Sequence, residues 1–188
     1  TQGISKAEAK NGNGEKDGHE NVTLRGRLTA KLSEGFELEA FGSYSDSETD
    51  TDSFGPTDGP DQSLSEEYLF GARAHLDLMD GRFNNTVSIE FSGIDRASIS
   101  TFGSFPGKGR RFNLDYLGVY TLSEGLFLTA GAQHESVKAE TVDPDSIDLN
   151  SVFGVLAYEN AGFFVSAGVR YDDHETFGDA TNGQLRAA

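Results

Sequence analysis

The chain has 188 residues, of which 36% are hydrophobic, and its formal net charge is -16 at pH 7. This acidic balance argues against a nucleic-acid partner, whose phosphates would be repelled, and the absence of cysteine excludes disulfides and thiolate metal sites. No run of about 18 apolar residues occurs, so the sequence contains no membrane-spanning helix. The mean hydropathy of -0.46 still allows a membrane-spanning sheet, in which only every second residue faces lipid.

Eight segments of the chain alternate apolar and polar residues with almost no exceptions. Successive side chains of a β-strand point to opposite faces, so each segment predicts a strand with one apolar and one polar face. In chain order the predicted strands are residues 22–32, 36–44, 68–78, 83–93, 112–122, 126–134, 152–158 and 163–171.

The two faces of these strands differ sharply in charge. No Asp, Glu, Lys or Arg occurs on the apolar face, which includes Leu28, Ala72, Ile89 and Val165. We therefore expect one face to meet lipid and the other to meet water. The polar face carries Arg25, Arg27, Lys31, Glu37, Glu39, Arg73, Asp77, Glu90, Asp115, Glu135, Glu159, Arg170 and Asp172.

The connections between the predicted strands alternate in length. The short ones contain the Gly, Asn, Asp or Ser that tight hairpins need, and aromatic residues lie at both rims of the apolar face. This pattern is typical of an up-and-down outer-membrane β-barrel, with short periplasmic turns and long extracellular loops. The short connections are 33–35, 79–82, 123–125 and 160–162, and the long ones are roughly 46–66, 95–110, 137–150 and 173–181.

The expected fold is an all-β, antiparallel up-and-down meander of eight to nine strands, an internal part of a larger transmembrane β-barrel. Eight strands would close on themselves only around a packed interior. Residues 1–21 are interpreted as an extracellular loop remnant, 22–181 as four hairpins, and 182–188 as a truncated ninth strand. The alternative is a soluble β-sandwich, which also alternates but has shorter strands and Greek-key connections.

Two stretches resemble the TonB-dependent outer-membrane receptors. One is Gly168-Val-Arg-Tyr-Asp-Asp-His-Glu-Thr-Phe-Gly178, which is similar to a strand-to-loop segment of those barrels. The other is Glu15-Lys-Asp-Gly18, followed after a hairpin by Tyr44-Ser-Asp-Ser-Glu-Thr-Asp-Thr-Asp52, which resembles the cobalamin-transporter branch. The resemblance implies uptake of a scarce ligand, cobalamin or an iron-siderophore, with a plug domain and the TonB energy-transducing complex as partners of the full-length protein.

The same resemblance implies a calcium site. In the cobalamin branch, carboxylates in these loops bind calcium, and matching by motif carries that role to Asp17, Asp46 and Asp52, with Glu15 and Asp50 as neighbours. Calcium prefers about six to eight oxygen ligands from flexible carboxylate-rich loops. The alternative interpretation is a solvated acidic loop.

The remaining features favour no enzyme. The sequence has no recognisable nucleophile or phosphate-binding motif, and its histidines His19, His75, His134 and His174 show no metal-ligand spacing. A basic cluster at Lys108, Arg110 and Arg111 is interpreted either as a solvated loop or as a contact for anionic lipid headgroups or a siderophore carboxylate.

The sequence therefore predicts a bacterial outer-membrane active-transport receptor fragment, in contact with outer-membrane lipid, that binds its ligand through extracellular loops. A passive porin or adhesin barrel remains an alternative, as does a soluble calcium- or carbohydrate-binding β-sandwich.

Overall fold

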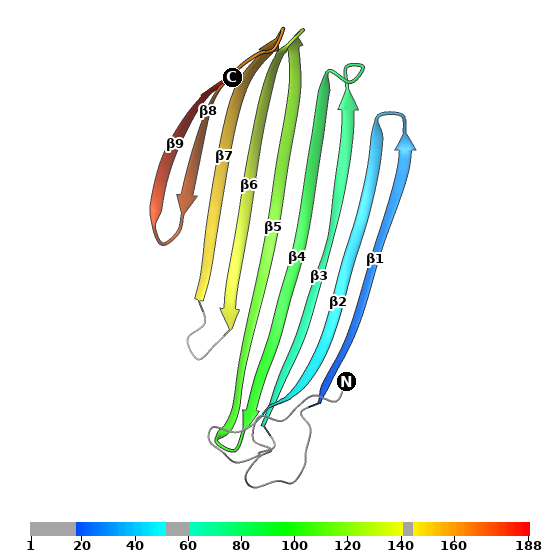
Figure 1. Cartoon of the computed structure of the whole chain (residues 1–188), viewed down its shortest axis with the longest axis vertical. Coiled ribbons are helices and arrows are strands. Elements are labelled where there is room, and N and C mark those ends of the chain that lie inside the picture. The colour runs from blue at the N-terminus through cyan, green and yellow to red at the C-terminus, as the bar shows by residue number, and fades with distance from the viewer. Residues whose placement is uncertain (1–17, 52–60, 141–144) are drawn as a thin grey trace.

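The structure, a computed structural model, describes residues 18–51, 61–140 and 145–188. Within these ranges, nine antiparallel strands form one sheet in which every strand pairs with its neighbours in the sequence (Figure 1). The predicted meander is therefore confirmed. The strands are β1 (His19–Ser33), β2 (Phe36–Thr51), β3 (Asp61–Leu78), β4 (Phe83–Ser100), β5 (Gly103–Ser123), β6 (Leu126–Glu140), β7 (Asp145–Asn160), β8 (Phe163–His174) and β9 (Gly178–Ala187). The described residues include no helix of the length and hydropathy that crossing a membrane requires.

The strands extend well beyond the segments that alternate in hydropathy. The prediction of a long loop at 95–110 is wrong, because β4 and β5 continue to Ser100 and from Gly103, with Ile99 paired to Ser104. At these ends polar and charged residues occur on both faces, so backbone pairing continues after the hydropathy pattern has stopped. For the same reason β1 starts at His19 and β9 at Gly178, each a few residues before its predicted start.

The short connections are tight hairpins, as predicted. Asp80 and Gly81 have φ angles of 56° and 81°, and Ala161 and Gly162 have φ angles of 52° and 83°. Positive φ at successive turn residues gives a hairpin the twist that matches its two strands.

The described residues form no hydrophobic core on either side of the sheet. Among the described residues no hydrophobic side chain is buried, and Leu24 and Leu28 are each 71% exposed. A β-sandwich buries the apolar face of one sheet against a second sheet, and here a single sheet leaves that face uncovered. The soluble-sandwich alternative is therefore wrong.

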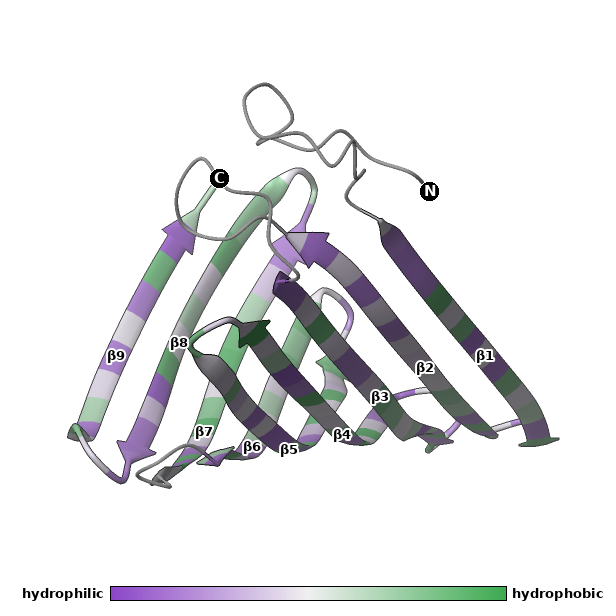
Figure 2. Cartoon of the chain, turned by 90° about the horizontal axis from the view of Figure 1, so that it is seen from below, coloured by the Kyte–Doolittle hydropathy of each residue, from purple (hydrophilic) through white to green (hydrophobic). Residues whose placement is uncertain are grey.

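Figure 2 shows the alternation directly, as hydrophilic and hydrophobic bands that follow one another along the strands. Strands β1 and β9 lie at the two opposite edges of the sheet (Figures 1 and 2). The face that includes Leu28, Ala72, Ile89 and Val165 is called the apolar face below, and the opposite one the polar face.

Candidate functional site: the polar face and the loop-side rim

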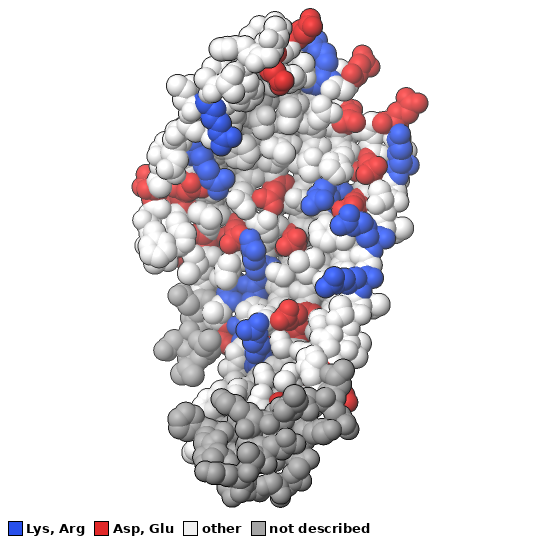
Figure 3. Space-filling model, in the orientation of Figure 1, with Lys and Arg blue, Asp and Glu red and all other residues white. Residues whose placement is uncertain are grey.

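Charges of both signs are interspersed over the polar face. Figure 3 shows this face, with Lys and Arg side chains next to Asp and Glu side chains along most of the strands. The strand register brings them together, because residues opposite each other on paired strands point to the same face. Glu39, for example, lies opposite Arg73 on β3 and opposite Thr29 on β1.

The first polar cluster joins β1, β2 and β3. Arg27 Nη1 and Arg73 Nη1 each lie 3.4 Å from a carboxylate oxygen of Glu39, whose side chain is only 12% exposed. Arg27 on β1 and Glu39 on β2, which one hairpin joins, thus form a cross-strand ion pair, and Arg73 on β3 joins them. Within the described residues, Lys31 and Glu37 are direct partners in the register but form no ion pair within 4 Å.

An aromatic ring lies beside this cluster, over a glycine. Phe41 pairs in register with Gly71, and a Cβ atom at Gly71 would lie 2.7 Å from Cζ of Phe41 and 2.6 Å from the Ile89 carbonyl oxygen. The ring therefore needs glycine beneath it. The guanidinium carbon of Arg73 lies 5.7 Å from the centre of the Phe41 ring, within cation–π range.

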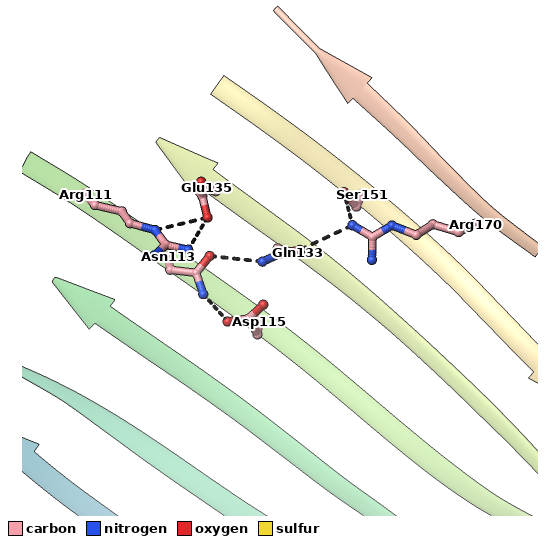
Figure 4. Close-up of polar contacts among 7 residues, drawn as sticks. All are labelled: Arg111, Asn113, Asp115, Gln133, Glu135, Ser151 and Arg170. Carbon is pink, nitrogen blue, oxygen red and sulfur yellow. Dashed lines mark hydrogen bonds and ion pairs between the residues drawn. The ribbon is translucent and has the colours of Figure 1, made fainter. Parts of the chain in front are cut away.

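A second polar network crosses β5 to β8 (Figure 4). Gln133 donates a 3.3 Å hydrogen bond to Oδ1 of Asn113, and its own carbonyl oxygen accepts one of 3.4 Å from Arg170. Asn113 also donates to Asp115, and Arg111 Nε donates a 3.1 Å hydrogen bond to Glu135. Four strands are thus connected by side chains as well as by their backbones.

Arg170 anchors the β7–β8 end of this network. Its Nη2 donates a 2.8 Å hydrogen bond to Ser151 Oγ, and its Nε donates one of 2.8 Å to Asp172 Oδ1. Ser151 Oγ in turn donates to Asp172 over 2.6 Å and is only 3% exposed. A guanidinium, a hydroxyl and a carboxylate therefore fix one another on a surface that otherwise faces water.

A row of aromatic rings crosses the apolar face close to the end of the sheet at which the longer connections lie. Successive ring centres on β3 to β6 lie 6.0, 5.3, 4.8 and 6.0 Å apart. Aromatic rows of this kind mark the boundary between lipid and water in membrane barrels. The row consists of Tyr68, Phe70, Phe91, Phe112 and His134.

Beyond the ring row, the apolar side of the sheet becomes charged. One row of direct cross-strand partners there is Asp46, Glu66, Asp95, Lys108 and Glu140. We call this region the loop-side rim. The hydropathy pattern did not predict this rim, because the alternation of apolar and polar residues ends before it. Continuing the strand register of the hairpin past Tyr44 and Tyr68 would have placed these charged residues on one face.

The predicted basic cluster is divided between the two faces. Lys108 Nζ lies 3.2 Å from Asp95 and Arg110 also pairs with Asp95, both at the rim, whereas Arg111 pairs with Glu135 on the polar face. The pKa of the Asp95 carboxyl is held below its usual value, mainly by the hydrogen bond from Arg110 and then by Lys108, while partial desolvation acts in the opposite direction. Interpreting the three cations as one loop surface was therefore wrong.

The predicted calcium ligands are only partly described. Glu15, Asp17 and Asp52 lie outside the described residues. Asp50 accepts a 3.1 Å hydrogen bond from the Gly18 amide and one of 3.2 Å from Gln62, whereas Asp46 lies opposite Glu66. In the described part of the chain, no group of three or more His, Cys, Asp or Glu side chains is placed to hold a metal ion.

The structure is thus a long antiparallel meander with one face that carries no charge between its rims, one polar face and a row of rings near its loop side, an architecture that the walls of β-barrels have. No family model matches the sequence, and no curated protein matches it significantly. Solved structures do match the fold. The ferric enterobactin receptor PfeA of Pseudomonas aeruginosa, in complex with enterobactin, superposes with a TM-score of 0.76 at 14% identity, covering 99% of this chain and 33% of that one.

Two further solved structures also match the fold of this chain. The siderophore receptor PiuA of Acinetobacter baumannii gives a TM-score of 0.64 at 9% identity, covering 100% of this chain and 40% of that one. The RagAB peptide transporter gives 0.60 at 10% identity, covering 92% and 30%. The resemblance to TonB-dependent receptor barrels is thus confirmed at the level of the fold, and the chain spans 30–40% of the length of these proteins.

Proposed function

We propose that this chain is a sector of the wall of an outer-membrane transport receptor. The observation that carries the proposal is the lipid-compatible apolar face, which has no ionised side chain between its two rims while its leucines stay exposed. The opposite face is polar and cross-linked by hydrogen bonds, as suits the water-facing side of a wide barrel. Among the described residues no strand pairs with the outer edge of β1 or of β9, which leaves room for further strands.

We further propose an iron-siderophore as the ligand. One of the matching structures is named as a siderophore receptor, and another as a ferric enterobactin receptor in complex with enterobactin. Cobalamin rests on the sequence resemblance alone and is the second candidate. In the full-length protein, the ligand would bind at the extracellular loops and the polar face would surround a plug domain coupled to the TonB complex.

The membrane assignment is tested by placing one charge on either face of the same strand. Val87 on β4 belongs to the apolar face, midway between Phe83 and Phe91, and its neighbour Ser88 belongs to the polar face. Val87→Lys should destabilise the barrel by about 2–4 kcal/mol in a bilayer, because a cation near the bilayer centre is costly. Ser88→Lys is the matched control and should have little effect. Equal losses in equilibrium unfolding of the full-length protein in bilayers would contradict the assignment.

The transport assignment is tested by uptake into cells. We expect a strain lacking the gene to lose accumulation of radiolabelled iron supplied as ferric enterobactin under iron limitation, and the full-length gene to restore it. Collapse of the proton-motive force should abolish the uptake. A passive porin, the alternative, would admit small solutes regardless of that force. Restored uptake of labelled cyanocobalamin instead of iron would identify the second candidate ligand.

Calcium binding is proposed for the acidic segment around β2, with Glu15, Asp17, Asp46, Asp50 and Asp52 as ligands. Carboxylate-rich loops suit calcium, and the Asp46–Glu66 pair places two like charges opposite each other, a repulsion that a divalent cation would relieve. Calcium should raise the thermal midpoint of the full-length protein, and Asp46→Ala or Asp52→Ala should reduce that rise. An unchanged midpoint on adding calcium would refute the site.

A further inference from the structure

The loop-side rim carries a cationic site whose position suggests a lipid contact. Arg110 on β5 and Lys138 on β6 are direct cross-strand partners, and Lys108 lies two residues from Arg110 on the same face. These three residues are called the cationic triad below. In a chain with a net charge of -16, three cations within two adjacent strands form a local exception to the acidic surface.

The triad lies directly beside the ring row. The guanidinium carbon of Arg110 is 5.4 Å from the centre of the Tyr68 ring, and Phe112 follows two residues further along β5. The ring row marks the depth at which lipid tails give way to headgroups. A cation held against one of its rings is therefore at headgroup depth and on the side of the sheet that faces lipid.

Hydrogen bonds and ion pairs hold the triad in place without neutralising all of its positive charge. Arg110 donates hydrogen bonds to the carbonyl oxygens of Ile94 and Gly109, at 3.2 and 2.9 Å, and pairs with Asp95. Lys108 shares the same carboxylate and remains 48% exposed, and Lys138 is exposed. Asp95 and Glu140 are the acidic residues among the direct cross-strand partners of the triad, so its three cations outnumber their immediate acidic partners.

We propose that the cationic triad binds the phosphate of an anionic lipid headgroup in the leaflet on the loop side of the membrane. Charge complementarity favours this occupant, because juxtamembrane Lys and Arg are attracted to anionic headgroups and the apolar rings beside them suit the upper part of the acyl chains. The acidic part of the rim, at Asp46 and Glu66 on β2 and β3, would direct the headgroup toward β5 and β6. The inference rests on the proposed membrane location.

The test uses the full-length protein in nanodiscs that contain phosphatidylglycerol or phosphatidylcholine, with bound lipid counted by native mass spectrometry. We expect preferential retention of phosphatidylglycerol, and a roughly tenfold or greater loss of that preference in Arg110→Gln combined with Lys138→Gln. Asp95→Asn should strengthen retention, because it frees Lys108 and Arg110. If these residues had a merely structural role, Asp95→Asn would not change phosphatidylglycerol retention in the direction opposite to the change caused by Arg110→Gln with Lys138→Gln.

The matched control is Arg96→Gln. Arg96 lies next to Asp95 on β4 but points to the polar face, where it is 3.6 Å from Glu67, so its loss should leave lipid retention unchanged. Lys138→Gln alone, at an exposed position, should weaken retention without unfolding the protein. Inorganic phosphate in millimolar excess should not displace the lipid, and displacement would overturn the assignment to a lipid in favour of a soluble anion.

The experiment distinguishes failure of the proposed membrane function from failure of the proposed headgroup site. A protein that does not insert into nanodiscs as a β-sheet, judged by circular dichroism, contradicts the proposed membrane function. An inserted protein that retains both lipids equally, or whose Asp95→Asn variant does not gain retention, overturns the headgroup site alone.

Discussion

The phenol of Tyr116 on β5 donates a 2.8 Å hydrogen bond to Oδ1 of Asn85 on β4, on the apolar face. The Asn85 amide nitrogen lies 3.3 and 3.2 Å from the carbonyl oxygens of Leu76 and Phe83, so the whole side-chain amide is satisfied. Gly118 makes this possible, because a Cβ atom there would lie 2.7 Å from the Tyr116 hydroxyl oxygen. A polar residue is thereby tolerated on the apolar face.

Removing that hydroxyl should cost stability. Tyr116→Phe leaves Asn85 with an unpaired acceptor facing lipid, and we expect a loss of about 1–2 kcal/mol in equilibrium unfolding. Adding Asn85→Leu should recover most of the loss, because both polar partners are then gone. Tyr120→Phe, on the same strand and face, is the control and should change little. If the stability changes caused by Tyr116→Phe and Asn85→Leu were simply additive in the double variant, the two side chains would not be energetically coupled.

A methyl group at Gly131 should be far more disruptive than one at Gly154. The Phe153 ring lies over Gly131, and a Cβ atom there would also approach the Tyr116 carbonyl oxygen to 2.9 Å. At Gly154 the nearest atom would be 4.0 Å away. Overpacking of this kind typically costs about 1–3 kcal/mol, so Gly131→Ala should lower the thermal midpoint of the full-length protein. Gly154→Ala should not, and a similar decrease for both would contradict the prediction.

Arg170 should stabilise the β7–β8 pair through its side chain. Arg170→Gln removes hydrogen bonds to Ser151, Asp172 and Gln133, and we expect a loss of about 1–3 kcal/mol with faster amide hydrogen exchange confined to β7 and β8. Arg186→Gln, on the exposed edge strand β9, is the control. Uniformly faster exchange across the sheet would instead indicate a global effect.

The contribution of Asp95 should depend on pH in a defined direction. Its pKa is lowered in the folded chain, chiefly by the Arg110 hydrogen bond, so folding favours the ionised carboxylate. The stabilisation is fully present above the unfolded-state pKa of Asp, about 4, and is lost as the pH falls through the lower folded-state value. The stability difference between wild type and Asp95→Asn should therefore be constant near neutrality and shrink in acid. A difference that grows in acid would contradict this sign.

The sequence predicted the strand centres, the hairpin turns and the two faces. Alternation with a period of two is a local property, so residues such as Leu28 and Ile89 could be assigned to a face without knowing any partner. The limits of the strands could not be predicted this way, because beyond Tyr44 and Phe91 both faces carry polar residues and hydropathy no longer distinguishes strand from loop.

The contacts within the candidate site could be predicted only from the strand register. Arg27 and Glu39 belong to one short hairpin, so their pairing followed from the sequence. Gln133 and Arg170 are 37 residues apart, and their contact depends on two successive strand pairings. The separation of Arg110 from Arg111 onto opposite faces followed only once residues 95–110 were seen to be paired strands rather than a loop.

The sequence by itself therefore determined which residues lie on the apolar face and which on the polar face, because each strand sorts its side chains alternately. The tertiary structure decided which charges meet, where rings lie over glycines, and that the rim cations lie on the apolar side. Those relationships depend on how each strand is aligned with its neighbour, and only backbone pairing across the sheet sets that alignment.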